Sequence, residues 1–273
     1  MSEDKIKELV KSIKHLSNTE YYSIKIESKT DRIFDSKIGG IPYWSPDKDY
    51  PANSNGKKLY LLAQINFDEE KVESPLPTKG ILQFFIDDND LMGLDLDNPT
   101  KQDGFRVVYH ETVDYKMTKE SIEKLGAIDT KKAQCFPIFD EFKISLHKGI
   151  DYVRPGDIHF YKYFALAYKE VFNKDLKNDE YYHKVLNDAE MNQLEKELES
   201  KKTNHKMLGY SYFTQEDPRY NKKYIDYDIL LFQIDSEGKY LMWGDCGIGN
   251  FFISKKSLDE KDFNNVLYNW DCC

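Results

Sequence analysis

The chain has 273 residues, of which 32% are charged and 40% hydrophobic, as expected for a soluble globular protein. A formal net charge of −9 argues against general binding to nucleic acid, which needs clustered cations, and against an anionic membrane surface. The sequence contains no run of about 18 apolar residues, so no membrane span is predicted.

The first part of the chain predicts one helix followed by strands. Apolar residues recur at helical spacing between Ile6 and Leu16, which predicts a helix over residues 4–16. Alternating and β-branched residues predict a strand within 20–34, and the prolines of 37–51 then interrupt regular structure. Three further strands are predicted at 59–67, 80–86 and 104–113.

The second part predicts a short helix at 117–126, an extended or irregular segment at 133–150 and a helical connector at about 155–201. Three strands follow, at 228–235, 239–245 and 250–254. In a closing helix, Ser257 and Glu260 are expected to form a capping box. The residues of this helix expected to face the core are Phe263, Val266, Leu267 and Trp270. These elements predict an α+β fold in one compact domain that spans the chain.

Two segments of the chain resemble each other at a nearly constant offset. Lys37, Gly40, Tyr43 and Gln64 correspond to Lys206, Gly209, Tyr212 and Gln233, each 169 residues further on (206 − 37 = 169). The sequence GILQFFI from Gly80 corresponds to GIGNFFI from Gly247, 167 residues further on (247 − 80 = 167). We therefore expect an internal duplication, with two related antiparallel β-rich units at about 30–115 and 203–255.

The paired glycines and glutamines are expected to serve the architecture of these units. Four glycines, Gly40, Gly80, Gly209 and Gly247, are assigned to turns that require glycine. Gln64 and Gln233 fall within apolar strands, where an unpaired amide is costly, so each must find hydrogen-bond partners. Either each amide bonds the loop of its own unit, which we favour, or both point into a shared cleft.

Four stretches in order, SKIGGIPYW, LLAQINF, LPTKGILQFFI and MWGDCGIGNFFI, resemble the YwqG-like family of uncharacterised bacterial proteins. The likeness runs from about residue 20 to the last residues. It implies a soluble α+β protein with extensive antiparallel sheet and transfers no catalytic residues. Members of that family also occur near bacterial toxin and immunity genes, which suggests a context without a mechanism.

The sequence carries no standard catalytic signature. The glycine-rich stretch 244–249 precedes a strand, whereas a phosphate-binding loop opens a helix. Cys246, beside Asp245, is a candidate nucleophile that would need a distant histidine, although a buried structural thiol is the commoner outcome. The acidic stretch 87–97 lacks the spacing of a calcium loop, so we expect a solvated acidic loop, no metal site and no cofactor.

A ligand site is expected around the second unit. The chain has four arginines, Arg32, Arg106, Arg154 and Arg219, and each guanidinium is a candidate ligand for an anion. Arg219 lies in a turn beside Asp217, either as a fixed ion pair or at the mouth of a cleft. We assign Arg219, Trp243 and Asp245 to that site, and Gln64 and Gln233 join them if they face a shared cleft.

These features predict a non-catalytic binding protein that recognises an unidentified protein or a small molecule in a cleft between the two units. One form is an immunity protein whose negative surface engages a basic toxin. The alternative is a hydrolase or transferase that uses Cys246 and Asp245. Four cysteines in a chain of this length indicate a reducing cytoplasm, and the sequence leaves open the role of Cys272 and Cys273.

Overall fold

The computed structural model describes residues 3–176, 182–199 and 205–273. Within these ranges, one sheet is built from β1 (Thr19–Lys29), β2 (Lys37–Ile38), β3 (Tyr60–Asn66), β4 (Ile81–Ile86), β5 (Phe105–His110), β6 (Phe142–Asp151), β7 (Lys206–Leu208), β8 (Ile229–Asp235), β9 (Ile248–Ile253) and β10 (Val266–Asp271). The α-helices are α1 (Glu3–Leu16), α2 (Lys119–Lys124), α3 (Phe160–Phe172), α4 (Tyr182–Val185), α5 (Asp188–Leu198) and α6 (Lys255–Asp259). Three 3-10 helices lie at η1 (Thr130–Lys132), η2 (Pro218–Tyr220) and η3 (Lys222–Tyr224).

The sheet is antiparallel. On each side of its two central strands, four strands follow one another outward in chain order. The order is β10-β9-β8-β7-β1-β6-β2-β3-β4-β5, with β1 and β6 paired at the centre. The four strands β2 to β5 extend to one side, and β7 to β10 extend to the other. As a result β1 lies beside β7, and β6 lies beside β2. The prediction of an α+β fold with a large antiparallel sheet is confirmed.

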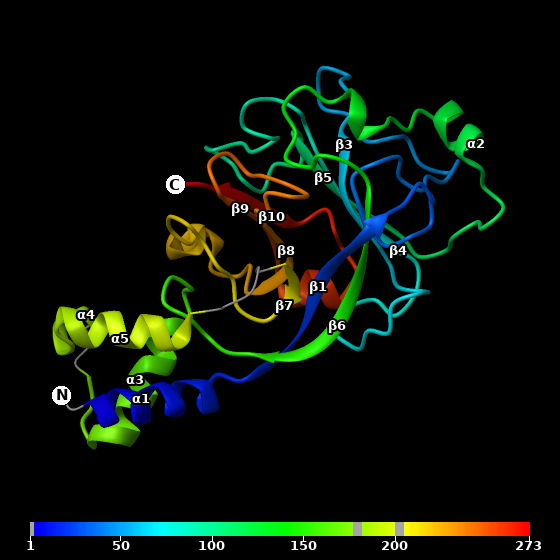
Figure 1. Cartoon of the computed structure of the whole chain (residues 1–273). Helices are drawn as coiled ribbons and strands as arrows, with labels where there is room; N and C mark the ends of the chain where they lie inside the picture. The colour runs from blue at the N-terminus through cyan, green and yellow to red at the C-terminus, as the bar shows by residue number, and fades with distance from the viewer. Residues whose placement is uncertain (1–2, 177–181, 200–204) are drawn as a thin grey trace.

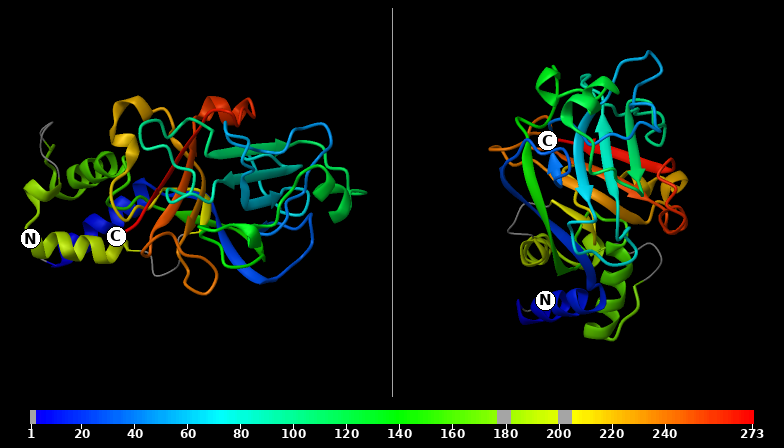
Figure 2. Two further views of the ribbon diagram at one scale, coloured as in Figure 1. Left: turned by 90° about the horizontal axis from the view of Figure 1, so that it is seen from above. Right: turned by 90° about the vertical axis from the view of Figure 1, so that its right-hand side faces the viewer.

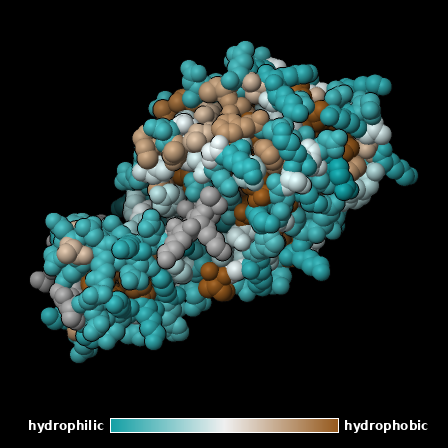
Figure 3. Space-filling view, viewed as in Figure 1, coloured by the Kyte–Doolittle hydropathy of each residue, from teal (hydrophilic) through white to brown (hydrophobic). Residues whose placement is uncertain are grey.

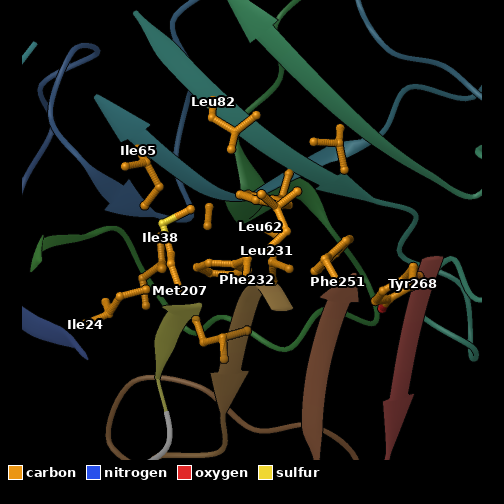
Figure 4. Close-up of a cluster of buried hydrophobic side chains, with 14 of the residues drawn as sticks. Ile24, Ile38, Leu62, Ile65, Leu82, Met207, Leu231, Phe232, Phe251 and Tyr268 are labelled. Carbon is orange, nitrogen blue, oxygen red and sulfur yellow. The ribbon is translucent and has the colours of Figure 1, made fainter. Parts of the chain in front are cut away.

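The sheet curls so strongly that its two sides face each other, as Figure 2 shows. Figure 4 shows Leu62 and Leu82 from one side pointing toward Leu231 and Phe251 from the other. Across this interior the ring of Phe84 in β4 lies 4.6 Å from that of Phe232 and 4.9 Å from that of Phe251, centroid to centroid. The main core therefore lies between the two sides of one sheet.

The helices α1, α3, α4 and α5 gather at one end of the sheet, beyond β1 and β7 (Figure 1). The apolar stripe of α1, which includes Leu9 and Ile13, is buried against Phe164 of α3 and Leu194 of α5 in a second core. An Asn187 side chain caps α5 by accepting a hydrogen bond from the amide of Glu190. The predicted connector at 155–201 contains α3, α4 and α5, while its residues 177–181 and 200–201 lie outside the described residues. Residues 203 and 204 of the second predicted unit do so as well.

The prediction of a closing helix is wrong for most of its residues. The helix there, α6, has five residues and is capped by Ser254, whose side chain accepts from the amide of Ser257. The capping box between Ser257 and Glu260 is therefore not formed. Residues Val266–Asp271 instead form β10, which pairs with β9 along its whole length. Apolar residues at helical spacing also suit a strand rich in Val, Tyr and Trp, and β9 supplies the hydrogen-bonding partner.

None of the helices in the described ranges has the length and apolar character needed to cross a bilayer. On the face shown in Figure 3, hydrophilic residues predominate and the most hydrophobic residues appear in small separate groups.

Candidate functional site

The paired glutamines each hold the loop of their own segment. The amide N–H of Tyr43 donates to Gln64 Oε1 at 2.9 Å, and the amide N–H of Tyr212 donates to Gln233 Oε1 at 2.8 Å. The Gln64 Nε2 group also donates to two backbone carbonyls, at 2.9 and 3.0 Å. Both side chains are fully buried. Each glutamine therefore bonds the loop of its own unit, which is the alternative favoured from the sequence.

The two corresponding lysines form buried ion pairs. Lys37 Nζ lies 2.5 Å from Glu141 Oε1, and Lys206 Nζ lies 2.8 Å from Asp151 Oδ2. Burial lowers the pKa of both lysines and raises the pKa of Glu141. Burial opposes ionisation of Asp151 too, but the charges of Lys206 and Arg154 outweigh it and hold its pKa below the ordinary value. Glu141 directly precedes β6 and Asp151 is its last residue, so the two ends of this strand support the two loops.

The glycines are required for two different reasons. Gly40 and Gly209 have φ of +76° and +72°, and a Cβ on either would also meet the carboxylate of a buried ion pair. Gly80 also has a positive φ, +78°, whereas Gly247 does not. The requirement shared by Gly80 and Gly247 is a close approach, because a Cβ would lie 2.2 or 1.9 Å from a carbonyl oxygen of the neighbouring strand. The turn-geometry prediction therefore needs correction at Gly247.

The sheet separates the residues assigned to a ligand site around Arg219. The Arg219 guanidinium lies over the ring of Phe252, 4.1 Å from its centroid. Trp243 lies against Gly249 and belongs to the main core. Because successive residues of β9 face opposite sides of the sheet, Arg219 and Trp243 lie on opposite faces. Asp245 is exposed in the turn before β9.

Cys246 is exposed in the same turn, with φ of +61°, so the expectation of a buried thiol is wrong. Among the described residues, no hydrogen bond or ion pair joins Cys246 or Asp245 to a histidine. The glycine-rich turn leads into β9, as expected.

The acidic stretch is less solvated than expected. Asp87 and Asp88 are buried, and both carboxylates pair with Lys57. These two bonds raise the pKa of Lys57. No group of three or more His, Cys, Asp or Glu side chains in the described part of the chain could hold a metal ion.

A pocket of about 460 Å³ lies where the sheet meets the helical end of the molecule. Its walls come from β1, from the loop at Ser74 and Pro75, from β7 and β8, and from the start of α3. Arg219 lines this pocket, together with His159 and Tyr210. It is the candidate functional site.

The buried carboxylate of Asp157 bonds several of the residues in and around the pocket. Asp157 Oδ2 accepts from Ser211 Oγ at 2.6 Å and from Arg219 Nη2 at 3.2 Å, and Asp157 Oδ1 lies 2.7 Å from His159 Nδ1. Arg219 Nη2 also lies 2.7 Å from Asp217 Oδ2, and the Arg219 side chain is 2% exposed. Arg219 therefore forms the fixed ion pair with Asp217 that was one of the two alternatives. Burial opposes ionisation of Asp157, but the His159 hydrogen bond and the Arg219 charge hold its pKa well below the ordinary value.

His159 lines the pocket, and one of its ring nitrogens is bonded to Asp157. Because the Asp157 carboxylate accepts from Nδ1–H, the neutral imidazole carries its lone pair on Nε2. The Nε2 atom has no hydrogen-bond partner among the described residues, and the side chain is 31% exposed. This pair was not predicted from the sequence, although Asp157 stands two residues before His159 at the start of a helix.

Aromatic rings and acidic groups complete the pocket. The ring of Tyr210 lies 6.0 Å from the rings of both His159 and Tyr163. Burial and a hydrogen bond with Tyr163 raise the pKa of Tyr210, which keeps its hydroxyl protonated. Asp228 and Glu20, which is paired with Lys148 at 3.0 Å, add carboxylates at the exposed rim. Because the guanidinium is neutralised by two acids, the pocket suits a neutral or positively charged ligand.

A family model described as a domain of unknown function (DUF1963) matches residues 36–272. The resemblance noted from the four sequence stretches is consistent with this match. No curated protein matches the chain.

Proposed function

The chain belongs to this family of unknown function, and we propose from the geometry of the pocket that it is a non-catalytic binding protein. Its ligand is a small organic molecule of neutral or positive charge. The observation that carries the proposal is the ring of His159, oriented by buried Asp157 and facing a pocket of about 460 Å³. A volume of this size is typical of small-molecule sites.

The position of the pocket supports a site built jointly by the two units. The loop at Ser74 and Pro75 belongs to the first unit, β1 precedes that unit, and β7 and β8 belong to the second. Binding there would draw on both parts of the chain, as ligand sites at junctions often do.

We further propose that the two units arose by internal duplication. Three observations support it: the matched Tyr–Gln hydrogen bonds, the matched lysine ion pairs, and a β-bulge at the same place in both units. The bulges lie between Leu61 and Ala63 of β3 and between Leu230 and Phe232 of β8. Their positions differ by the same 169 residues as the sequence match (230 − 61 = 169).

Calorimetric titration with tyramine, a small aromatic amine, tests the binding proposal. We expect tyramine to bind, because its ammonium group suits the acidic rim and its ring suits the two tyrosines. The analogue 4-hydroxyphenylacetate, which carries a carboxylate in place of the amine, should bind at least about tenfold more weakly. His159→Ala should weaken tyramine binding about tenfold through loss of the ring and its acceptor.

His147→Ala is the matched control, because His147 is an exposed histidine on β6 that does not line the pocket. It should leave tyramine affinity unchanged. A preference for the carboxylate analogue, or equal effects of the two histidine variants, would contradict the proposal.

A further inference from the structure

Arg106 differs from the other three arginines of the chain. Arg32, Arg154 and Arg219 each pair with at least one aspartate within 4.0 Å. Arg106 forms no ion pair or hydrogen bond with its side chain in the described part of the protein, and its Nε atom is buried without a partner. A buried, unpaired guanidinium nitrogen carries a desolvation cost. The two terminal nitrogens of Arg106 are not buried in this way, so they are the donors that a ligand can reach.

The position of Arg106 places it in a second pocket, separate from the candidate functional site. Arg106 lies on β5, the strand at one end of the sheet order. The pocket, of about 300 Å³, is lined by Lys48, Lys261, Asp49 and Trp44 as well as by Arg106. None of its lining residues lines the pocket that contains His159.

The charge balance of this second pocket is positive, although the chain carries a net charge of −9. Lys48 Nζ donates to the carbonyl of Tyr109 at 2.7 Å and, within the described ranges, has no carboxylate within 4.0 Å. Lys261 is paired with Glu111 at 2.8 Å. Arg106 and Lys48 are therefore two uncompensated cations that line one pocket, and Asp49 is the acid that lines it with them.

We propose that this pocket binds the phosphate group of a small phosphate monoester. The planar guanidinium offers paired donors that match two phosphate oxygens, and the Lys48 ammonium adds a second positive charge for a dianion. Trp44 and Phe263 also line the pocket and are available to the carbon part of the ester. The site is independent of the function proposed for the first pocket.

Isothermal titration of the full chain at low ionic strength with phenyl phosphate tests this proposal. Wild-type protein should bind the ester, and Arg106→Gln should weaken it at least about tenfold, because charge-assisted hydrogen bonds are lost. Arg106→Lys should recover part of the affinity, since it restores the charge without the planar fork. Arg32→Gln is the matched control, because Arg32 is 68% exposed and pairs with Asp35 elsewhere, and it should leave affinity unchanged.

Inorganic phosphate and succinate separate the possible sources of binding. Inorganic phosphate should bind more weakly than phenyl phosphate but respond to the same variants, and succinate, a dicarboxylate of equal charge, should bind more weakly than either. Circular dichroism of Arg106→Gln checks that the variant is folded. The proposal is overturned if wild-type protein does not bind phenyl phosphate, if folded Arg106→Gln binds it as tightly, or if succinate binds as well.

Discussion

At the scale of single residues, His110 shows how packing alters a titratable group. Its ring lies edge-on to those of Tyr43 and Trp44, with centroids 5.1 and 5.0 Å away. The Nε2 atom lies 3.1 Å from the Gln83 side-chain oxygen. Burial and the positive charge of Lys48 lower the pKa of His110 to about 4. The folded protein therefore holds a neutral imidazole at pH values where an exposed histidine takes up a proton.

This shift predicts a pH dependence of stability. The pKa of His110 falls from an ordinary value of 6.5 to about 4, so between these values the unfolded chain binds a proton that the folded chain does not. The free energy of unfolding should then decrease as pH falls through this window, by about 3 kcal/mol in total from this group. Urea denaturation from pH 7 to 4 measures it.

The variant His110→Asn should lose stability at pH 7 but show a flatter dependence than wild type. His147→Asn, which changes an exposed histidine, should keep the wild-type slope. Equal slopes for wild type and His110→Asn would show that His110 does not control this window.

At the scale of elements, the pairing of β3 with β4 is repeated by β8 and β9. Gln64 lies opposite Gln83 in the first pair, and Gln233 lies opposite Asn250 in the second. Gln83 Nε2 donates to the Tyr43 carbonyl at 2.7 Å, and Asn250 Nδ2 donates to the corresponding carbonyl of the second loop at 3.1 Å. Two neighbouring strands thus hold each loop through a pair of buried amides.

The close approach at Gly247 predicts the effect of a methyl group there. In Gly247→Ala the Cβ would lie 1.9 Å from the Asp271 carbonyl oxygen, so β9 and β10 must separate. We expect a loss of about 1–3 kcal/mol in the free energy of unfolding, measured by urea denaturation. Gly238→Ala is the control, because its nearest neighbour would be Met242 Cε at 3.6 Å. A Gly247→Ala variant as stable as the control would contradict this explanation.

At the scale of the whole molecule, the central strands join the two sides of the sheet. β1 pairs with β6 and also with β7, which belongs to the later part of the chain. β6 in turn pairs with β2 from the earlier part. The strands β2 to β5 therefore lie beside β6 from the later part of the chain, and β7 to β10 lie beside β1 from the earlier part. Neither side of the sheet is complete without a strand from the other part of the chain.

This exchange predicts that the two parts cannot fold as separate monomers. A fragment of residues 1–127 holds β1 to β5 without β6, and a fragment of 128–273 holds β6 to β10 without β1. We expect each fragment alone to lack a cooperative thermal transition as a monomer, because its edge and core residues stay exposed. An equimolar mixture should regain the circular dichroism of the intact chain. A fragment that unfolds cooperatively while it sediments as a monomer would disprove this dependence.

Much of the local structure was predictable from the sequence, because local patterns act over short distances. Helical spacing from Ile6 to Leu16 identified α1, and runs of apolar and β-branched residues identified β3, β4, β8 and β9. The match of Gln64 with Gln233 indicated two residues with the same hydrogen bond. The strand β10 was missed, since its apolar residues suit a helix equally well until β9 is beside it.

The sequence by itself determined the α+β class and indicated which buried amides need partners, because these follow from neighbouring residues and from the cost of unpaired polar groups. Tertiary structure alone decided which residues meet. It joined Asp157 to Arg219 across 62 residues, placed Trp243 on the other face of the sheet, and left Arg106 without an acid. Such contacts depend on strand order and on the curvature of the sheet, which residue spacing does not encode.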